Sequence, residues 1–269
     1  MVGMPTLLHI SSAPSTAEPI GESESIRRPR PPHLKRSFPR SIAHFAKNVD
    51  YRVPVALYRD QAVVIRTQKL GEADRIVTLF SKAHGRIRAV AKGVRRTKSK
   101  FGARLEPASY VDIQLYTGKT FDVVTQVESL ENFGDTLAND YQKWTIASAI
   151  LEASERFTSN EGEPALQQFL LLTGALKALA HESHDPSLIL DAYLLRSLSV
   201  AGYAPSMTIC SRCEAPGPHK YFSLVGGGSV CVNCKPSASA TPSIETLTLM
   251  SDLLTGNWDG ADTSELKNR

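Results

Sequence analysis

The stretch AVVIRTQKLGEADRIVTLFSKAHGRIRAVA, residues 62–91, decides the fold of the first half of this chain. It contains three short runs rich in β-branched residues, at 62–67, 75–80 and 86–91, and such runs are typical of β-strands. Ala83, His84 and Gly85 form a tight turn between the second and third runs. The stretch therefore predicts three consecutive short strands.

Two further strands follow after a longer interval. Residues 110–116 alternate between apolar and polar side chains, so one face of that strand is predicted to be buried. Residues 117–120 turn the chain into a fifth run, 121–127. Because an open sheet this small leaves its edges exposed, we expect a closed five-stranded barrel of the OB type. Its longest connection joins the third and fourth strands.

That connection holds the most charged segment of the chain, KGVRRTKSKFGAR, residues 92–104, with six Lys or Arg and no acid. Isolated charges are too costly to bury, so this segment must face solvent or a polyanion. OB folds hold single strands with cations that follow the phosphates and with aromatic rings that stack on bases. Phe101 is either such a ring or an anchor that fixes the connection to the barrel. The residues predicted to bind nucleic acid are Arg66, Arg75, Arg86, Arg88, Lys92, Arg95, Arg96, Lys98, Lys100, Phe101 and Arg104.

The charge distribution supports a polyanionic partner. Residues 1–104 carry 21 Lys or Arg and 7 Asp or Glu, whereas residues 105–269 carry 10 and 20. This polarity suggests a basic binding face joined to an acidic body, with nucleic acid as the leading partner; the alternative is solvated charge without a partner. No phosphate-binding loop, dinucleotide fingerprint, HExxH or GxSxG motif occurs. We therefore expect a protein that is not an enzyme.

The start of the chain offers no secretory signal, and the most apolar segment, 165–180, is too short and polar to span a bilayer. A cytoplasmic, nucleoid-associated protein is expected. Residues 1–57 are rich in Ser, Pro and Arg, a composition that predicts a disordered basic extension. The predicted organisation is α+β and multidomain: this extension, an OB-fold domain over 58–133, and a helical domain over 134–269.

The second half has helical periodicity, with apolar residues three and four apart. These positions are expected to form the core rather than a site. The predicted stripes are Trp144, Ala147, Ile150 and Leu151; Leu166, Phe169, Leu170, Thr173, Leu176 and Leu179; and Leu190, Tyr193, Leu194 and Leu198.

All four cysteines lie in one segment, 207–236, as two CxxC pairs separated by 17 residues. Two residues between cysteines let both thiolates face one metal, and a second pair completes a tetrahedral all-sulfur site. Such a site leaves no open position for substrate. We therefore expect one structural Zn²⁺ per chain, held by Cys210, Cys213, Cys231 and Cys234. A thioredoxin-like redox role is disfavoured because no βαβ context surrounds the pairs.

Several segments together resemble the RecO family, the bacterial recombination mediators of the RecF pathway. The resemblance runs over about residues 56–255 and is closest to the actinobacterial, cysteine-bearing branch. It rests on LYRDQAVVI (57–65), LGEADRIV (70–77), AVAKGVRR (89–96), SKFGARLEP (99–107), LDAYLLR (190–196) and GGSVC (227–231). Two features depart from the family pattern: residues 1–54 precede its usual start, and the family usually continues beyond the position of Arg269.

The resemblance implies an N-terminal OB fold, a central helical domain and a zinc-bearing segment. It implies binding of single- and double-stranded DNA and annealing of complementary strands. It also implies that, together with RecR, the protein loads RecA onto strands coated by single-strand-binding protein, whose acidic C-terminal tail family members contact.

Two other function classes fit parts of the sequence. An RNA- or transcription-associated binding protein can also combine a zinc ribbon with an OB fold, and its preference for RNA over DNA would distinguish it. A zinc enzyme would lose activity on metal removal without unfolding, but a site filled by four cysteines argues against this class.

Overall fold

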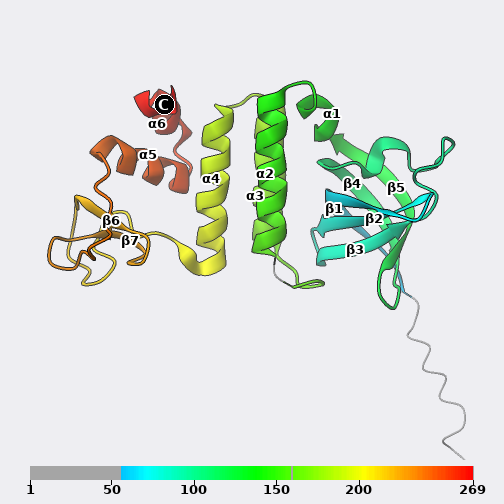
Figure 1. Ribbon diagram of the computed structural model, residues 1–269, viewed down its shortest axis with the longest axis horizontal. Coiled ribbons are helices and arrows are strands. Elements are labelled where there is room, and N and C mark those ends of the chain that lie inside the picture. Colours follow the sequence, from blue (N-terminus) through cyan, green and yellow to red (C-terminus); the bar gives the residue numbers. More distant parts are fainter. Residues whose placement is uncertain (1–55, 159, 269) are drawn as a thin grey trace, which may run out of the picture. The chain divides into compact units, whose positions relative to one another are not determined.

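The computed structural model describes residues 56–158 and 160–268 (Figure 1). The predicted N-terminal extension lies outside these residues except for its last two positions, and Leu57 is already the first residue of a strand.

Five strands form a closed barrel in the order β1-β2-β3-β5-β4. All neighbours are antiparallel except β3 and β5, which are parallel. The predicted five-stranded OB-like architecture is confirmed, with the longest connection between β3 and β4. The strands are β1 (Leu57–Leu70), β2 (Asp74–Ser81), β3 (Gly85–Ala91), β4 (Ser109–Tyr116) and β5 (Asp122–Asn132).

The long first strand closes the barrel because it pairs with β2 along its second half and with β4 along its first half. Ala62 and Val64 point into the barrel with Val77 and Leu79. Successive side chains of a strand point to opposite faces, so Val63 lies on the outside. It is nevertheless completely buried. The uninterrupted apolar run at 62–65 thus marks a strand covered on both faces.

Helices cover that outer face. Val63, Ile65 and Phe80 share one core cluster with residues of the helical region, and the rings of Phe80 and Phe169 meet edge to face at 5.8 Å. Each fully buried aliphatic or aromatic side chain of this kind contributes roughly 1.5–3 kcal/mol to folding. The barrel and the helices therefore share one hydrophobic core.

The helical region begins with α1 (Phe133–Leu137), α2 (Tyr141–Phe157), α3 (Leu166–Ala180) and α4 (Pro186–Leu198). The last three pack on one another, and Figure 1 shows α4 beside α2 and α3, which overlap in this view. Asp140 caps α2 by accepting a hydrogen bond from the Lys143 amide, and Asp185 caps α4 ahead of Pro186 at its first turn. These caps satisfy backbone donors that would otherwise lack partners.

The predicted apolar stripes are confirmed in part. The stripe of α2 is correct at Ala147, Ile150 and Leu151, which are buried. On α3 the stripe was wrong at Leu166 and Leu170, which are 46% and 50% exposed. The side chains that α3 buries instead include Gln168 and Leu172, because the helices on both sides of α3 shift its buried face. Leu198, at the end of α4, is also exposed.

The remaining chain carries the cysteine segment and the C-terminal helices. Its elements are η3 (Ser199–Tyr203), β6 (Tyr221–Ser223), β7 (Gly228–Val230), α5 (Ile244–Thr255), α6 (Trp258–Thr263) and η4 (Glu265–Asn268). Leu253 and Ala261 pack against Leu188 and Ala192 of α4, so α5 and α6 are fixed to the helical region. Within the described residues, no helix has the length and apolar character needed to cross a membrane.

Candidate functional site

The basic connection between β3 and β4 is held against the barrel by apolar side chains. Val94, Phe101 and Leu105 are 8%, 2% and 1% exposed and belong to the barrel core. A short 3₁₀ turn, η2 (Gly102–Leu105), follows Phe101. The backbone of this segment is thereby fixed, while its charged side chains are left at the surface.

Of the two roles that the sequence leaves open for Phe101, its burial favours the anchor over stacking on a base. Its ring is almost completely buried among barrel residues, so neither face is free for a nucleobase. Lys100 covers the ring from outside, with its Nζ 5.0 Å from the ring centroid and 3.0 Å from the carbonyl oxygen of Thr125. The sequence left both roles open because an aromatic residue in a basic segment suits either.

The cations of the connection fall into two groups. Arg95 donates to the carbonyl oxygens of Gly71 and Glu72 at 3.3 and 2.9 Å, which ties the connection to the β1–β2 turn. Arg104 donates to carbonyls of the connection itself. The second group is Lys92, Arg96 and Lys98, whose side chains are exposed and have no hydrogen bond or ion pair among the described residues.

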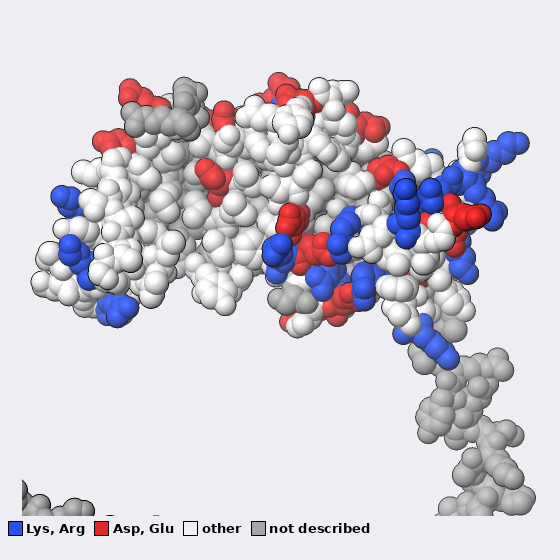
Figure 2. Space-filling view, in the orientation of Figure 1, with Lys and Arg blue, Asp and Glu red and all other residues white. Residues whose placement is uncertain are grey.

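The predicted barrel arginines differ from this second group because acidic residues or carbonyls of the chain already bind them. Arg66 pairs with Glu155 at 2.8 Å and Arg75 with Glu106 at 2.5 Å. Arg88 pairs with Glu161 at 2.5 Å, and Arg86 donates to the carbonyl oxygen of Glu155 at 3.1 Å. Figure 2 shows Lys and Arg gathered over the barrel, with Asp and Glu among them. Among the described residues, Lys92, Arg96 and Lys98 thus form a free group, whereas the barrel arginines and the other cations of the connection form a partnered group.

The four cysteines converge on one point and could bind a metal ion. Their sulfur atoms all lie within 4.8 Å of one another, and the sulfurs of Cys213 and Cys231 are 3.8 Å apart. Cys210 is completely buried, whereas Cys213 is exposed. Four sulfur ligands suit a tetrahedral ion such as Zn²⁺.

The backbone favours the thiolate at one of the four cysteines, Cys210, whereas hydrogen bonds with neighbouring sulfurs raise the pKa of Cys213 and of Cys234. The amide of Cys231 donates to the sulfur of Cys210 at 3.4 Å, and this hydrogen bond lowers the pKa of the Cys210 thiol to about 6. Gly228 allows the segment at Ser206 to approach, because a Cβ on residue 228 would lie 2.3 Å from the Ser206 carbonyl oxygen. Metal ligands must be deprotonated, so a lowered pKa favours binding.

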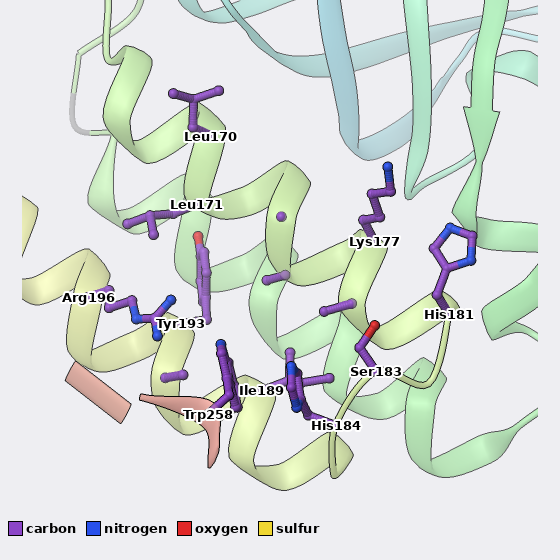
Figure 3. A pocket seen from close by; sticks show the side chains of 14 residues that line it. Leu170, Leu171, Lys177, His181, Ser183, His184, Ile189, Tyr193, Arg196 and Trp258 are labelled. Carbon is purple, nitrogen blue, oxygen red and sulfur yellow. The ribbon is translucent and has the colours of Figure 1, made fainter. Parts of the chain in front are cut away.

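A cavity of about 490 Å³ lies beside α3 and α4, with an apolar lining and cations at its ends (Figure 3). Tyr193, Arg196 and Trp258 lie at one end, and Lys177 and His181 at the other (Figure 3). The predicted stripes contained Tyr193 and assigned it to the core. Lys177 and Arg196 line the cavity but lie outside these stripes, so the apolar periodicity gave no signal for a site here.

Arg196 is unusually placed for an arginine. Its Nε donates to the Leu253 carbonyl oxygen at 2.8 Å, and its guanidinium lies 5.5 Å from the ring centroid of Trp258. One terminal nitrogen, Nη2, is buried without a hydrogen-bond partner, and burial lowers the pKa of the side chain. The ring of His184 stacks on the indole of Trp258, with 3.9 Å between the two ring centroids. A ligand that carries both negative charge and apolar side chains would complement the cations and the apolar lining of this cavity.

Comparison with known proteins gives matches over almost all of the described residues. Residues 55–133 match the family model for the Recombination protein O N terminal, and residues 138–269 match the Recombination protein O C terminal. A DNA repair protein RecO of Streptomyces avermitilis is 54% identical over 217 residues, which cover 78% of this chain and 88% of the relative. One of Thermobifida fusca is 54% identical over 215 residues, covering 80% and 88%.

Replacing Phe101 tests whether it is an anchor. Phe101→Ala should destabilise the protein by roughly 3 kcal/mol, since it removes a buried aromatic ring, and thermal melting would measure this. Phe101→Leu keeps most of the buried volume and should retain wild-type affinity for an oligonucleotide. If Phe101→Leu melted normally but bound single strands about tenfold more weakly, the ring would act on DNA after all.

Proposed function

The chain belongs to the RecO family of DNA repair proteins, and from this premise we propose that it is a recombination mediator that binds single- and double-stranded DNA and anneals complementary strands. The observation that carries the proposal is the trio Lys92, Arg96 and Lys98 on the rim of a closed OB-type barrel. Three exposed cations that have no partner within the described part of the chain, on a backbone fixed by buried anchors, form a prepared site for phosphates.

The free cations are better placed for phosphates than the partnered arginines. A phosphate that binds Lys92, Arg96 or Lys98 does not have to displace an acid of the protein. Contacts to phosphates release counterions from DNA and carry no sequence information. A protein that binds in this way accepts any sequence, which a repair factor requires.

Annealing needs no catalytic residue in this scheme. Two complementary strands repel each other through their phosphates, and a cationic surface that holds both lowers this repulsion and raises their local concentration. Base pairing then supplies the specificity. We therefore assign the protein no catalytic role.

We further propose that the ion held by the four cysteines is Zn²⁺ and that its role is structural. The sulfur-only ligand set and the two CxxC spacings support zinc. The surrounding segment has only the two short strands β6 and β7, and it buries few large apolar side chains. Small segments of this kind commonly depend on a metal or disulfides for stability.

The cavity beside α3 and α4 is our candidate site for the acidic C-terminal tail of single-strand-binding protein. An acidic peptide brings carboxylates for Lys177 and Arg196 and apolar side chains for the lining. Joint action with RecR to load RecA onto coated strands, in the cytoplasm and at the nucleoid, completes the proposal. Family membership supports these partners.

Reversing the charges of the free cations tests the DNA site. The triple variant Lys92→Glu, Arg96→Glu, Lys98→Glu should weaken binding to any oligonucleotide by at least about tenfold, because three phosphate contacts are lost. The slope of log affinity against log salt should become shallower by about 2, at roughly 0.7 per phosphate on a single strand. Annealing should slow in parallel.

The matched control reverses three exposed cations outside the barrel, Arg156, Lys220 and Lys235, and so changes the net charge equally. Equal weakening by both triple variants would reduce the effect to net charge and contradict a site on the connection. An RNA oligonucleotide of the same length, bound more tightly than DNA, would contradict the choice of DNA.

Removing a ligand tests the metal. Elemental analysis should find about one zinc per chain, and Cys213→Ser or Cys231→Ser should lose it and lower the melting temperature, since metal binding is coupled to folding. Arg212→Ala, inside the first CxxC pair, is the control and should keep its zinc. Cysteine variants that lose zinc but melt like wild type would show that the metal is not structural.

Charge reversal at the cavity tests the tail site. Lys177→Glu should weaken binding of a peptide with the acidic tail sequence several-fold, because an exposed charge pair contributes up to about 1 kcal/mol. Fluorescence anisotropy of the labelled peptide measures this, and Arg156→Glu serves as the control. Unchanged affinity in Lys177→Glu would place the tail elsewhere.

A further inference from the structure

A cleft of about 490 Å³ lies between β3, the turn that joins β4 to β5, and the loop that joins α2 to α3. Its lining residues include Arg86, Arg88, Thr117, Thr120 and Asp122. Arginine and threonine side chains are common donors to phosphate oxygens. The carboxylate of Glu161 also lines the cleft.

The α2–α3 loop reaches this cleft because the barrel is incompletely paired there. β3 and β5 pair only at Ala89 with Asp122 and at Val90 with Val123, so the first half of β3 has no strand beside it on that edge. The loop occupies this edge: Glu161 forms a bridge with Arg86, and the amide of Gly162 donates to the Arg86 carbonyl oxygen at 3.0 Å.

Close approach of the loop depends on Gly85. A Cβ at this position would lie 1.8 Å from the carbonyl oxygen of Glu163, and Gly85 also has a φ of +65°. Only glycine meets both conditions without strain. The sequence of β3 is thus adapted to receive the acidic loop.

The contact places a carboxylate where a phosphate oxygen would bind. Nε of Arg88 is 2.5 Å from Oε1 of Glu161, and the guanidinium lies 5.1 Å from the ring centroid of Phe121. The side chains of Arg88 and Glu161 are 44% and 41% exposed. Ion pairs this exposed are weak, so another anion can replace the carboxylate. Phe121 would keep the guanidinium in position after the exchange.

A second pair from the same part of the chain repeats the arrangement. Glu155, near the end of α2, pairs with Arg66 at 2.8 Å, and its carbonyl oxygen accepts a hydrogen bond from Arg86. Three barrel arginines are therefore held by the end of α2 and the loop that follows it. These contacts join the barrel to the end of α2 and to the α2–α3 loop.

We propose that this cleft is a second phosphate site for single-stranded DNA and that Glu161 is an internal competitor occupying it in the free protein. The inference rests on the proposed DNA-binding function, which it deepens. DNA is held first by the free cations of the β3–β4 connection. A strand that extends along β3 then displaces Glu161 from Arg88. Affinity for DNA is thereby set below the value that the cations alone would give, which favours exchange of strands over permanent binding.

Removing the charge of the competitor tests the proposal. Glu161→Gln should bind an oligo-dT about two- to fivefold more tightly than wild type at low salt, because one exposed ion pair no longer has to be broken. The control Glu152→Gln removes the same charge from α2, where Glu152 pairs only with Arg156 of the same helix. This control should bind like wild type.

A second substitution identifies the arginine involved. In the Glu161→Gln background, Arg88→Gln should abolish the gain. Equal affinity of Glu161→Gln and Glu152→Gln, or weaker binding by Glu161→Gln, would overturn the proposal. A lower melting temperature for both Glu161→Gln and Arg88→Gln with no gain in affinity would show that the pair only fixes the loop to the barrel, and this too would overturn it.

The DNA-binding function and the role of Glu161 as a competitor can be contradicted independently. If the Lys92, Arg96 and Lys98 reversal abolishes DNA binding while Glu161→Gln has no effect, the DNA-binding function stands and the competitor does not. If the oligo-dT shows no salt-dependent binding to wild type, the proposed function itself fails.

Discussion

The closure of the barrel by β1 is the constraint on which the other features depend. One long strand pairs with β2 along one half and with β4 along the other, so the sheet has an inside and an outside that cannot be exchanged. Because side chains alternate between faces, closure also fixes that Val63 and Phe80 point outward. An outward apolar surface has to be covered, and α2 and α3 cover it.

Covering the barrel separates its cations into two populations. Helices that pack over β1 and β2 bring Glu155 and Glu161 to the arginines at the margin of the contact. On the β3–β4 connection, Lys92, Arg96 and Lys98 have no partner among residues 56–158 and 160–268. Exposed charges without partners are available to a polyanion, whereas the paired ones must first be released. Burial of the apolar face thus determines which cations can bind phosphates directly and which must first leave an acidic partner.

The cysteine segment meets a different constraint. It is joined to α4 on one side and to α5 on the other, and its two short strands enclose little apolar volume. The four sulfurs lie within 4.8 Å of one another, and the metal ion proposed there would supply a fixed point that packing alone does not provide. The segment leads into α5 and α6, which pack against α4 around Leu253. Its position therefore also affects how Trp258 is placed beside Arg196 at one end of the cavity.

The sequence by itself determined whatever is local along the chain. The five strands, the basic connection, the helical character of α2, α3 and α4 and the two CxxC pairs all follow from periodicity, composition and spacing over a few residues, although β1 and β5 extend beyond the predicted runs. The tertiary structure decided what depends on residues far apart. It buried Phe101, exposed Leu170 and paired Arg66 with Glu155, 89 positions away. It also gave Gly85 its role, through a carbonyl oxygen at residue 163. Local sequence patterns indicate which side chains are stabilised by burial or by an opposite charge. Which residue becomes the partner is determined only when the helices pack against the barrel.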